Sequence, residues 1–265
     1  MKLLIVDAFT DRPFAGNPAA VCLLEQERDA KWMQDVAAEM NLSETAFVRV
    51  LDDGFELRWF TPAIEVELCG HATLASAHAL WTEGHVKAGQ PIRFHTRSGV
   101  LTCTQAGDLI ELDFPVTPAR EAEPPAGLLD GLGVQPSFVG KSKFDKFILI
   151  ESENVVRSLK PDFTALRQIP MRGVIVTSPS DDPQFDFVSR YFAPGAGIDE
   201  DPVTGSAHCC LGPYWSEQLG KIEMTAFQAS ARGGIVRLRV NDDRVLLGGQ
   251  AVTVLRGELT GHVAS

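Results

Sequence analysis

Residues 58–62 of the chain read RWFTP, and residues 190–194 read RYFAP, 132 positions later. A second pair of matching runs, CGHA at 69–72 and TGSA at 204–207, is separated by 135 positions. A three-residue insertion within 195–204 reconciles the two offsets. Matches that keep the same order at a nearly constant offset indicate an internal duplication. This period is far longer than the repeat of a solenoid, so each copy is expected to be a domain with its own core.

Each copy is rich in short apolar runs bounded by Gly, Pro, Asp or Asn, which is the pattern of β-strands. Helical segments are fewer, and the sequence predicts them at 28–40, 70–82, 163–168 and 205–218. The chain is therefore expected to be an α+β protein with two pseudo-symmetric, β-rich domains, each built mostly of strands around one central helix.

The segment 117–134 separates the two copies. It is rich in Pro, Ala, Gly and Glu and lacks apolar alternation, as a linker does. The sequence thus predicts an N-terminal domain at 1–117 and a C-terminal domain at 118–265. The last predicted strand, 252–265, is a candidate addition to the N-terminal domain.

The composition excludes several classes of partner. The 265 residues include 35 acidic and 24 basic side chains, and the formal net charge of −11 repels nucleic-acid phosphates and anionic lipid surfaces. No apolar stretch approaches the roughly 18–20 residues that span a bilayer. The five cysteines are odd in number and lack C-x-x-C spacing, which predicts reduced thiols in a cytoplasmic protein.

The matching loops 68–72 and 202–207 each place a glycine, Gly70 or Gly205, directly before a predicted helix. Free backbone N–H groups and the helix dipole favour anions at such positions. We expect equivalent loops to face each other in a cleft between the copies and to bind a small carboxylate-bearing substrate there. Taken alone, each loop also fits a simple glycine-initiated helix start.

Three side chains are candidates for proton transfer. Glu44 lies in an apolar run, where an unused carboxylate is costly, so it is a candidate general base; the run also fits a surface Glu on the polar face of a strand or in a capping turn. His71 follows Gly70 and is placed to carry a proton. Asp201 precedes the second loop, where it either holds His71 in one tautomer or belongs to a solvated acidic turn. Ser206 is the counterpart of His71 in the second copy.

The sequence lacks the spacing of other common active sites. His71 and His78 are seven residues apart with no suitable third ligand nearby, and 208–210 offers no tetrahedral zinc pattern. There is no Gly-x-Ser-x-Gly elbow and no phosphate-binding Gly-Lys-Ser/Thr loop. We therefore expect no metal and no cofactor, and the chemistry that remains is proton transfer.

Five motifs together resemble the phenazine-biosynthesis-like family, from about residue 5 onward. They are FAGNP at 14–18, SETAF at 43–47, RWFTP at 58–62, CGHAT at 69–73 and DPVTGSA at 201–207. The resemblance implies a diaminopimelate-epimerase-like fold, in which each domain is a barrel-like sheet around a central helix, and commonly a homodimer. It also implies a cofactor-independent isomerase that moves a proton and a double bond in a small cyclic or unsaturated carboxylate.

The resemblance further implies roles for particular residues. The catalytic residues would be Glu44 as the general base, with His71 and Asp201 relaying protons. The residues that bind the substrate would be Asn17, Gly70, Gly205 and Ser206.

Two other functions stay open at this point. Related racemases and epimerases use two opposed thiols, but the offset of 135 places Thr204 opposite Cys69, and Cys209 comes five residues later, about a turn and a half along the helix. Cys69 is then expected to be a packing residue. The second alternative is a non-catalytic relative that binds small molecules or proteins, since a fold does not dictate an activity.

Overall fold

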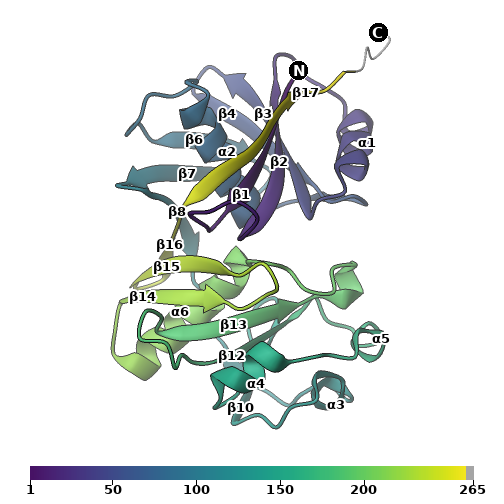
Figure 1. Cartoon of the computed structure of the whole chain (residues 1–265), viewed down its shortest axis with the longest axis vertical. Helices are drawn as coiled ribbons and strands as arrows, with labels where there is room; N and C mark the ends of the chain where they lie inside the picture. Colours follow the sequence, from purple (N-terminus) through teal and green to yellow (C-terminus); the bar gives the residue numbers. More distant parts are fainter. Residues whose placement is uncertain (261–265) are drawn as a thin grey trace. The chain divides into compact units, whose positions relative to one another are not determined.

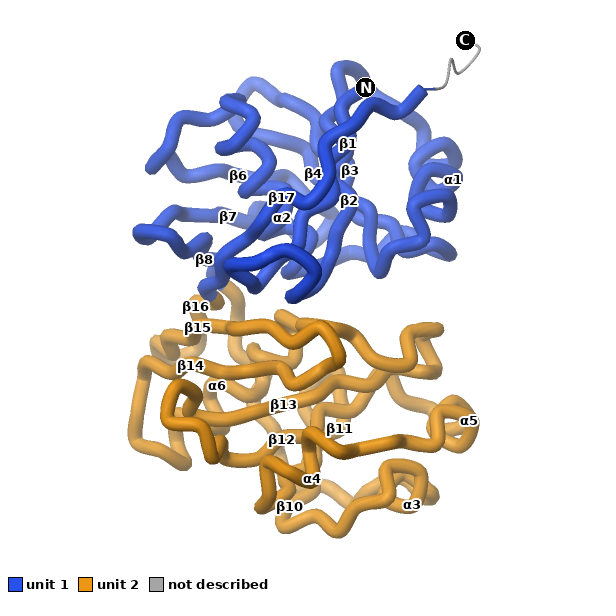
Figure 2. The backbone as a smooth tube through the Cα atoms, viewed as in Figure 1, with its two compact units in different colours: residues 1–113, 248–265 blue, residues 114–247 orange. Residues whose placement is uncertain are grey.

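The computed structural model describes residues 1–260 (Figure 1). The chain forms two compact units, which Figure 2 colours separately. Unit 1 consists of Met1–Asp113 together with the chain from Gly248 onward, and unit 2 consists of Phe114–Leu247. In residues 1–260, no helix is long and apolar enough to cross a bilayer.

Unit 1 is a mixed sheet with two helices. Its elements are β1 (Lys2–Ala8), β2 (Asn17–Leu24), α1 (Ala30–Met40), β3 (Glu44–Leu51), β4 (Gly54–Phe60), β5 (Glu65–Val66), α2 (Gly70–Thr82), β6 (Ile92–Thr96), β7 (Gly99–Ala106), β8 (Leu109–Pro115), which leads into unit 2, and β17 (Ala251–Glu258). Pairing is antiparallel for β1–β2, β3–β4, β6–β7 and β7–β8, and parallel for β2–β3 and β4–β6.

Helix α2 is the central helix of unit 1. Its residues 71–77 are all buried, and it packs on β1, β2, β3 and β17 (Figure 1). A helix that is apolar or small-sided all round belongs in a core, and the alanines of this segment let strands approach it from several sides. The α2 bounds match the helix predicted at 70–82.

Helix α1 lies on the outside of the sheet and starts two residues later than predicted. The carboxylate of Asp29 accepts a hydrogen bond from the Trp32 backbone N–H, so Asp29 is the N-cap rather than a helical residue. The buried side chains Met33, Val36 and Ala37 follow the i, i+3, i+4 spacing of an amphipathic helix and join the core of the unit.

Unit 2 repeats this architecture. Its elements are β9 (Arg120–Glu121), α3 (Leu128–Leu132), β10 (Phe138–Lys141), β11 (Lys146–Leu149), α4 (Glu153–Ser158), α5 (Phe163–Leu166), β12 (Val174–Pro179), β13 (Phe187–Phe192), the 3₁₀ turn η1 (Pro194–Ala196), α6 (Gly205–Leu219), β14 (Glu223–Gln228), β15 (Gly234–Asn241) and β16 (Arg244–Gly249). Pairing is antiparallel for β10–β11, β12–β13 and β14–β15, and parallel for β11–β12 and β13–β14. The order of parallel and antiparallel pairs is therefore the same as in unit 1.

The segment 117–134, predicted as a linker, contains structure. It holds β9 and the short helix α3, and both Leu128 and Leu132 are buried in the core of unit 2. The pair is spaced four residues apart, about one helical turn, in a stretch otherwise rich in Pro, Ala, Gly and Glu. Its apolar side chains were too few to predict a helix.

The repeated arginine makes the same contact in both units. Arg58 donates two hydrogen bonds to Glu65, at 2.8 and 2.9 Å, and Arg190 donates two to Glu200, at 2.6 and 2.8 Å. Bidentate pairing fixes the planar guanidinium and the carboxylate in one geometry. Each pair thereby holds the loop that leads from the β4 or β13 strand to the central helix.

Two strands, β9 and β17, follow the last strand of one copy along the chain and pair with the first strand of the other copy. The strand β9 follows β8 along the chain and pairs with β10, the first strand of the second copy. The strand β17 follows β16 and pairs with β1 along its whole length. The strand predicted at 252–265 thus corresponds to β17, whose residues pair within unit 1, while 261–265 lies outside the described residues. His78 also contacts Thr253 of β17, with 3.0 Å between Nε2 and Oγ1.

Candidate functional site

Glu44 and His71 meet in unit 1. Glu44 is the first residue of β3 and His71 is the second residue of α2, and their side chains are 14% and 5% exposed. Nε2 of His71 lies 3.3 Å from Oε2 of Glu44, at ion-pair distance but without the alignment of a hydrogen bond. The structure therefore places the predicted general base beside the predicted proton carrier, in a largely buried position.

Asn17 determines the tautomer of His71. Its side-chain nitrogen Nδ2 lies 3.1 Å from Nδ1 of His71, and both residues are buried. An amide nitrogen only donates, so Nδ1 of the ring accepts and the ring proton sits on Nε2, facing Glu44. The sulfur of Cys69 is 3.5 Å from the same Nδ1, where a thiol also acts as a donor.

His71 is neutral in this environment. Burial lowers its pKa from the ordinary 6.5 to about 3, because the charged imidazolium would lose its hydration. A neutral ring with its proton on Nε2 offers Glu44 a hydrogen-bond donor rather than a resting positive charge. We call the set of Asn17, Glu44, Cys69 and His71 the acid–base corner.

Gly16 allows Asn17 to reach the ring. Its φ of +63° is in the left-handed region, and an added Cβ would lie 2.1 Å from the carbonyl oxygen of Ala8. Only glycine adopts this backbone without strain and without that overlap. The FAGNP motif therefore has a structural reason, since the turn at Gly16 delivers Asn17 to the start of β2.

Cys69 lies beside Glu44 and His71, which the sequence analysis did not predict. Oxygen, sulfur and nitrogen ligand atoms of Glu44, Cys69 and His71 all lie within 4.8 Å of one another, a set that could hold a divalent ion such as zinc. Sequence reasoning had assigned Cys69 to packing. The signal that it missed is the position of Cys69 as the N-cap of α2, two residues before His71.

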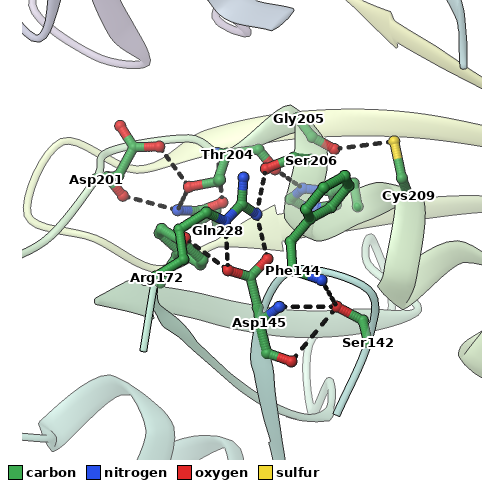
Figure 3. Close-up of polar contacts among 12 residues, drawn as sticks. Ser142, Phe144, Asp145, Arg172, Asp201, Thr204, Gly205, Ser206, Cys209 and Gln228 are labelled. Atoms are coloured by element: carbon green, nitrogen blue, oxygen red, sulfur yellow. Dashed lines mark hydrogen bonds and ion pairs between the residues drawn. The ribbon is translucent and has the colours of Figure 1, made fainter. Parts of the chain in front are cut away.

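Asp201 and Thr204 form the loop before α6 in unit 2. The Thr204 hydroxyl donates to Oδ2 of Asp201 at 2.5 Å. Gln228 from β14 accepts from the Thr204 backbone N–H at 2.8 Å and donates to the Asp201 carbonyl at 2.7 Å, as Figure 3 shows. These contacts hold the loop against the sheet and fix the place where α6 begins.

Ser206 contacts Arg172, which in turn pairs with Asp145, and the sequence analysis singled out neither of these two residues. Nη2 of Arg172 donates to Oγ of Ser206 at 3.1 Å, and the same guanidinium makes two hydrogen bonds to Asp145, one of them 2.8 Å long from Nε to Oδ1 (Figure 3). The Tyr191 hydroxyl donates to Asp145 at 2.9 Å. Burial and the neighbouring Asp145 charge raise the pKa of Tyr191 above its ordinary value, so Tyr191 remains a donor. We call the set of Asp145, Arg172 and Ser206 the arginine corner.

The seven residues predicted from the sequence fall into two groups. Unit 1 holds Asn17, Glu44, Gly70 and His71, and unit 2 holds Asp201, Gly205 and Ser206. Gly70 and Gly205 are the first residues of α2 and α6, and neither helix has a side-chain cap or an acidic residue in its first turn. The predicted cleft between the copies stays a prediction.

A two-thiol racemase would need a cysteine at the start of both α2 and α6, and among the described residues only α2 has one there. Cys69 is the N-cap of α2 and Thr204 is the N-cap of α6, so the two residues occupy the same position in the two units. Cys209 lies further along α6, where burial raises the pKa of its thiol to about 12. A thiol with that pKa is a poor proton acceptor near neutral pH.

Comparison with known proteins matches residues 6–257 to the family described as phenazine biosynthesis-like protein. An uncharacterized isomerase of Halalkalibacterium halodurans is 58% identical over 97% of each chain, and the human phenazine biosynthesis-like domain-containing protein is 44% identical over 98% of this chain and 99% of its own. Among solved structures, a PhzF-family phenazine biosynthesis protein of Enterococcus faecalis superimposes with a TM-score of 0.93 at 40% identity, covering 98% of both chains. A predicted epimerase of Pseudomonas aeruginosa shares the fold at 22% identity, with a TM-score of 0.74 over 100% of this chain and 99% of its own.

The fold and its relatives define an isomerase or epimerase with the diaminopimelate-epimerase-like fold. The chain belongs to the phenazine biosynthesis-like family. The prediction of an α+β fold with two β-rich domains is confirmed, as is the prediction that the protein is an enzyme of the isomerase class.

Proposed function

We propose that the protein is a cofactor-independent isomerase that moves a proton and a double bond within a small cyclic or unsaturated carboxylate. The observation that supports this best is the 3.3 Å contact between Glu44 and the neutral ring of His71. A carboxylate that is mostly buried beside a neutral imidazole, with 14% of its side chain exposed, suits general base catalysis on a small substrate.

The proposed reaction needs one base and no external reactant. Glu44 takes a proton from a carbon next to an unsaturated system, and the electrons of the broken C–H bond shift the double bond. The resulting carboxylic acid returns the proton to a carbon at the far end of the shifted system, so that substrate and product have the same composition. In this proposal Nε2 of His71, 3.3 Å from Oε2 of Glu44, helps to orient the carboxylate toward the substrate.

In this proposal unit 2 contributes to substrate binding. Gly205 and Ser206 begin α6 without a side-chain cap, and backbone N–H groups at such a helix start favour a carboxylate. Asp201 is proposed as a second proton-relay group, and Gly70 as part of the corresponding helix start in unit 1.

We also propose that the protein is a cytoplasmic homodimer whose partner is a small molecule, not a nucleic acid or a membrane. The net charge of −11 and the family resemblance support this proposal. Light scattering coupled to size-exclusion chromatography tests it, since a mass close to a single chain at micromolar concentration would contradict the dimer.

Solvent deuterium exchange tests the activity across several classes of candidate substrate at once. The protein is incubated in D₂O with a panel of cyclic unsaturated carboxylates and free amino acids, and incorporation of deuterium at carbon is followed by mass spectrometry. We expect exchange with an unsaturated carboxylate, its loss in Glu44→Gln and its retention in Cys69→Ala. Loss in Cys69→Ala with retention in Glu44→Gln would instead select the racemase alternative.

Retained exchange in both variants would remove Glu44 from the mechanism. No exchange with any member of the panel would favour the non-catalytic alternative. Circular dichroism of each variant confirms that a lost activity reflects lost chemistry rather than lost structure.

A further inference from the structure

The strand registers align the two units residue by residue. Phe60 and Phe192 end the repeated runs 58–60 and 190–192. Phe60 pairs with Thr45 across β4 and β3, and Phe192 pairs with Val174 across β13 and β12. Thr45 and Val174 are therefore equivalent positions.

The residues that precede these two positions differ in chemistry. Ser43 and Glu44 lead into β3, and Arg172 and Gly173 stand at the same two positions before β12. The base of the acid–base corner thus has glycine as its counterpart, and the next residue upstream is an arginine.

The neighbouring strand extends the equivalence. Thr45 pairs with Ala20 of β2, and Val174 pairs with Lys146 of β11, so Ala20 and Lys146 correspond. Asn17 lies three residues before the first, and Asp145 lies one residue before the second. In both units a polar side chain near the start of β2 or β11 contacts another residue of the corner. Asn17 contacts His71 at the start of α2, and Asp145 contacts Arg172 just before β12.

Each unit consequently has one corner at the starts of two neighbouring parallel strands and of its central helix, although only His71 and Ser206 occupy equivalent positions. In unit 1 it joins Asn17, Glu44 and His71, and in unit 2 it joins Asp145, Arg172 and Ser206. The unit 1 corner carries a base and a neutral imidazole. The unit 2 corner carries a cation and a hydroxyl, and its carboxylate, Asp145, accepts hydrogen bonds from Arg172 and Tyr191.

The guanidinium of Arg172 is held rigidly although it is not buried. Its side chain is 41% exposed, whereas the side chain of its partner Asp145 is 1% exposed. Nε and Nη2 are directed at Asp145, and the Phe144 ring lies 4.9 Å from the guanidinium carbon (Figure 3). An exposed surface pair would leave such a long side chain mobile, so this buried anchor preorganises the exposed edge of the fork.

The packing around Gly173 also supports the position of Arg172. A Cβ added to Gly173 would lie 2.2 Å from the Tyr191 hydroxyl, which donates to Asp145. Glycine at this position therefore lets Tyr191 support the carboxylate that holds Arg172.

Ser206 presents a second donor at the same place. Its Oγ accepts from Arg172, so the hydroxyl proton is directed away from the guanidinium and can be donated to another acceptor. A guanidinium edge and a hydroxyl side by side match the two oxygens of a carboxylate. A lone serine at this helix start would offer one hydrogen bond without the charge.

We propose that Arg172 and Ser206 form a carboxylate-binding site within unit 2. Binding of a carboxylate by this arginine corner does not depend on the proposed function. Arg172 is then the residue that supplies the positive charge for binding the anion, and Ser206 supplies a second donor.

The test uses benzoate, a planar ring carboxylate, as the probe. Benzoate is titrated into the full-length protein at constant ionic strength, with chloride as the control anion, and the ¹⁵Nε–H signals of the arginines are followed by NMR. We expect the Arg172 signal to shift saturably with benzoate. We expect affinity to fall at least tenfold in Arg172→Gln and several-fold in Ser206→Ala.

Two further variants keep the result interpretable. Arg172→Gln leaves Asp145 buried without its cation and can unfold the protein, so Arg172→Lys, which keeps the charge but loses the fork, is measured beside it and is also expected to bind more weakly. Arg167→Gln removes a comparably exposed arginine of unit 2 that pairs with Asp199, and it is expected to bind benzoate as the unmodified protein does.

Equal benzoate affinity in the unmodified protein, Arg172→Lys and Ser206→Ala would overturn the proposal. Glu44→Gln separates it from the proposed function, because that variant should lose deuterium exchange and retain benzoate binding. Benzoate binding that depends on Arg172 in a protein without any exchange activity would sustain the anion site and refute the isomerase.

Discussion

Nδ2 of Asn17 lies 3.1 Å from Nδ1 of His71, and this contact directs the ring proton to Nε2, toward Glu44. The two residues are 54 positions apart in the sequence and meet only because β2 and α2 pack together. Asn17 is therefore a positioning residue for the acid–base corner, whatever contact it makes with a substrate.

Asn17→Asp should reverse the polarity of this contact. An aspartate accepts where the amide donates, so Nδ1 must carry a proton, and the proton on Nε2 is kept only if the ring becomes charged. We expect the pKa of His71 to rise and exchange activity to fall by roughly 10- to 100-fold, with a changed pH profile. The ¹⁵N shifts of His71 report the tautomer directly and require no substrate. Asn154→Asp, at an exposed position, is the matched control and should change neither.

Gly16→Ala should lower both stability and activity. The substitution forces a Cβ to within 2.1 Å of the Ala8 carbonyl oxygen at a φ of +63°, and we expect a loss of about 1–3 kcal/mol in the free energy of unfolding. Gly84→Ala provides the comparison, since Gly84 has a φ of +76° with nothing within 4 Å of an added Cβ. Both variants place an alanine at a positive φ, but only Gly16→Ala also brings its Cβ onto the Ala8 carbonyl oxygen. Urea denaturation should therefore show a larger loss of stability for Gly16→Ala, and equal losses would contradict the close contact at Gly16.

The buried histidines should make the fold less stable in acid. Burial lowers the pKa of His71 from 6.5 to about 3, so between these values the unfolded chain binds a proton that the folded chain excludes. The contribution of His71 is complete above pH 6.5 and is lost as the pH falls toward 3. We expect the loss of stability between about pH 7 and pH 4 to be smaller in His71→Gln than in the unmodified protein. Exposed His85 gives the control, because His85→Gln should keep the original pH dependence of urea denaturation.

Cys209→Ala should leave the exchange activity within about twofold of the unmodified protein. Burial raises the pKa of the Cys209 thiol to about 12, and its sulfur is directed to the Gly205 carbonyl oxygen, 3.5 Å away. A proton acceptor near neutral pH is thus not expected there. The measurement is the deuterium exchange described above, with Glu44→Gln as the inactive reference, and a large loss in Cys209→Ala would revive a two-thiol mechanism.

Sequence patterns predicted the elements that carry strong local signals. The small, apolar run after Gly70 predicted α2 with its observed bounds, and the matching run after Gly205 predicted α6 to within one residue. Glu44 stood out because a carboxylate is rare in an apolar run. Its proximity to His71 followed from the motifs, but the distance between them required the structure.

The arginine corner could not be predicted in the same way. Asp145 and Arg172 lie outside every repeated run, and they meet because β11 and β12 are adjacent parallel strands in a particular register. A register is set by pairing over the whole sheet, which local patterns of apolar residues do not specify. The same reason explains why Asn17 was assigned to substrate binding and not to His71.

The pairing of β17 with β1 has a consequence for how the protein is made. The strand β1 is translated early and pairs at once with β2, yet its second antiparallel neighbour, β17, appears only after all of unit 2. Unit 2 has no such delay, since β9 precedes β10. We therefore expect unit 2 to complete its fold during translation before unit 1, because the edge of β1 stays unpaired until β17 is made. This order is the reverse of the usual N-to-C order of domain folding.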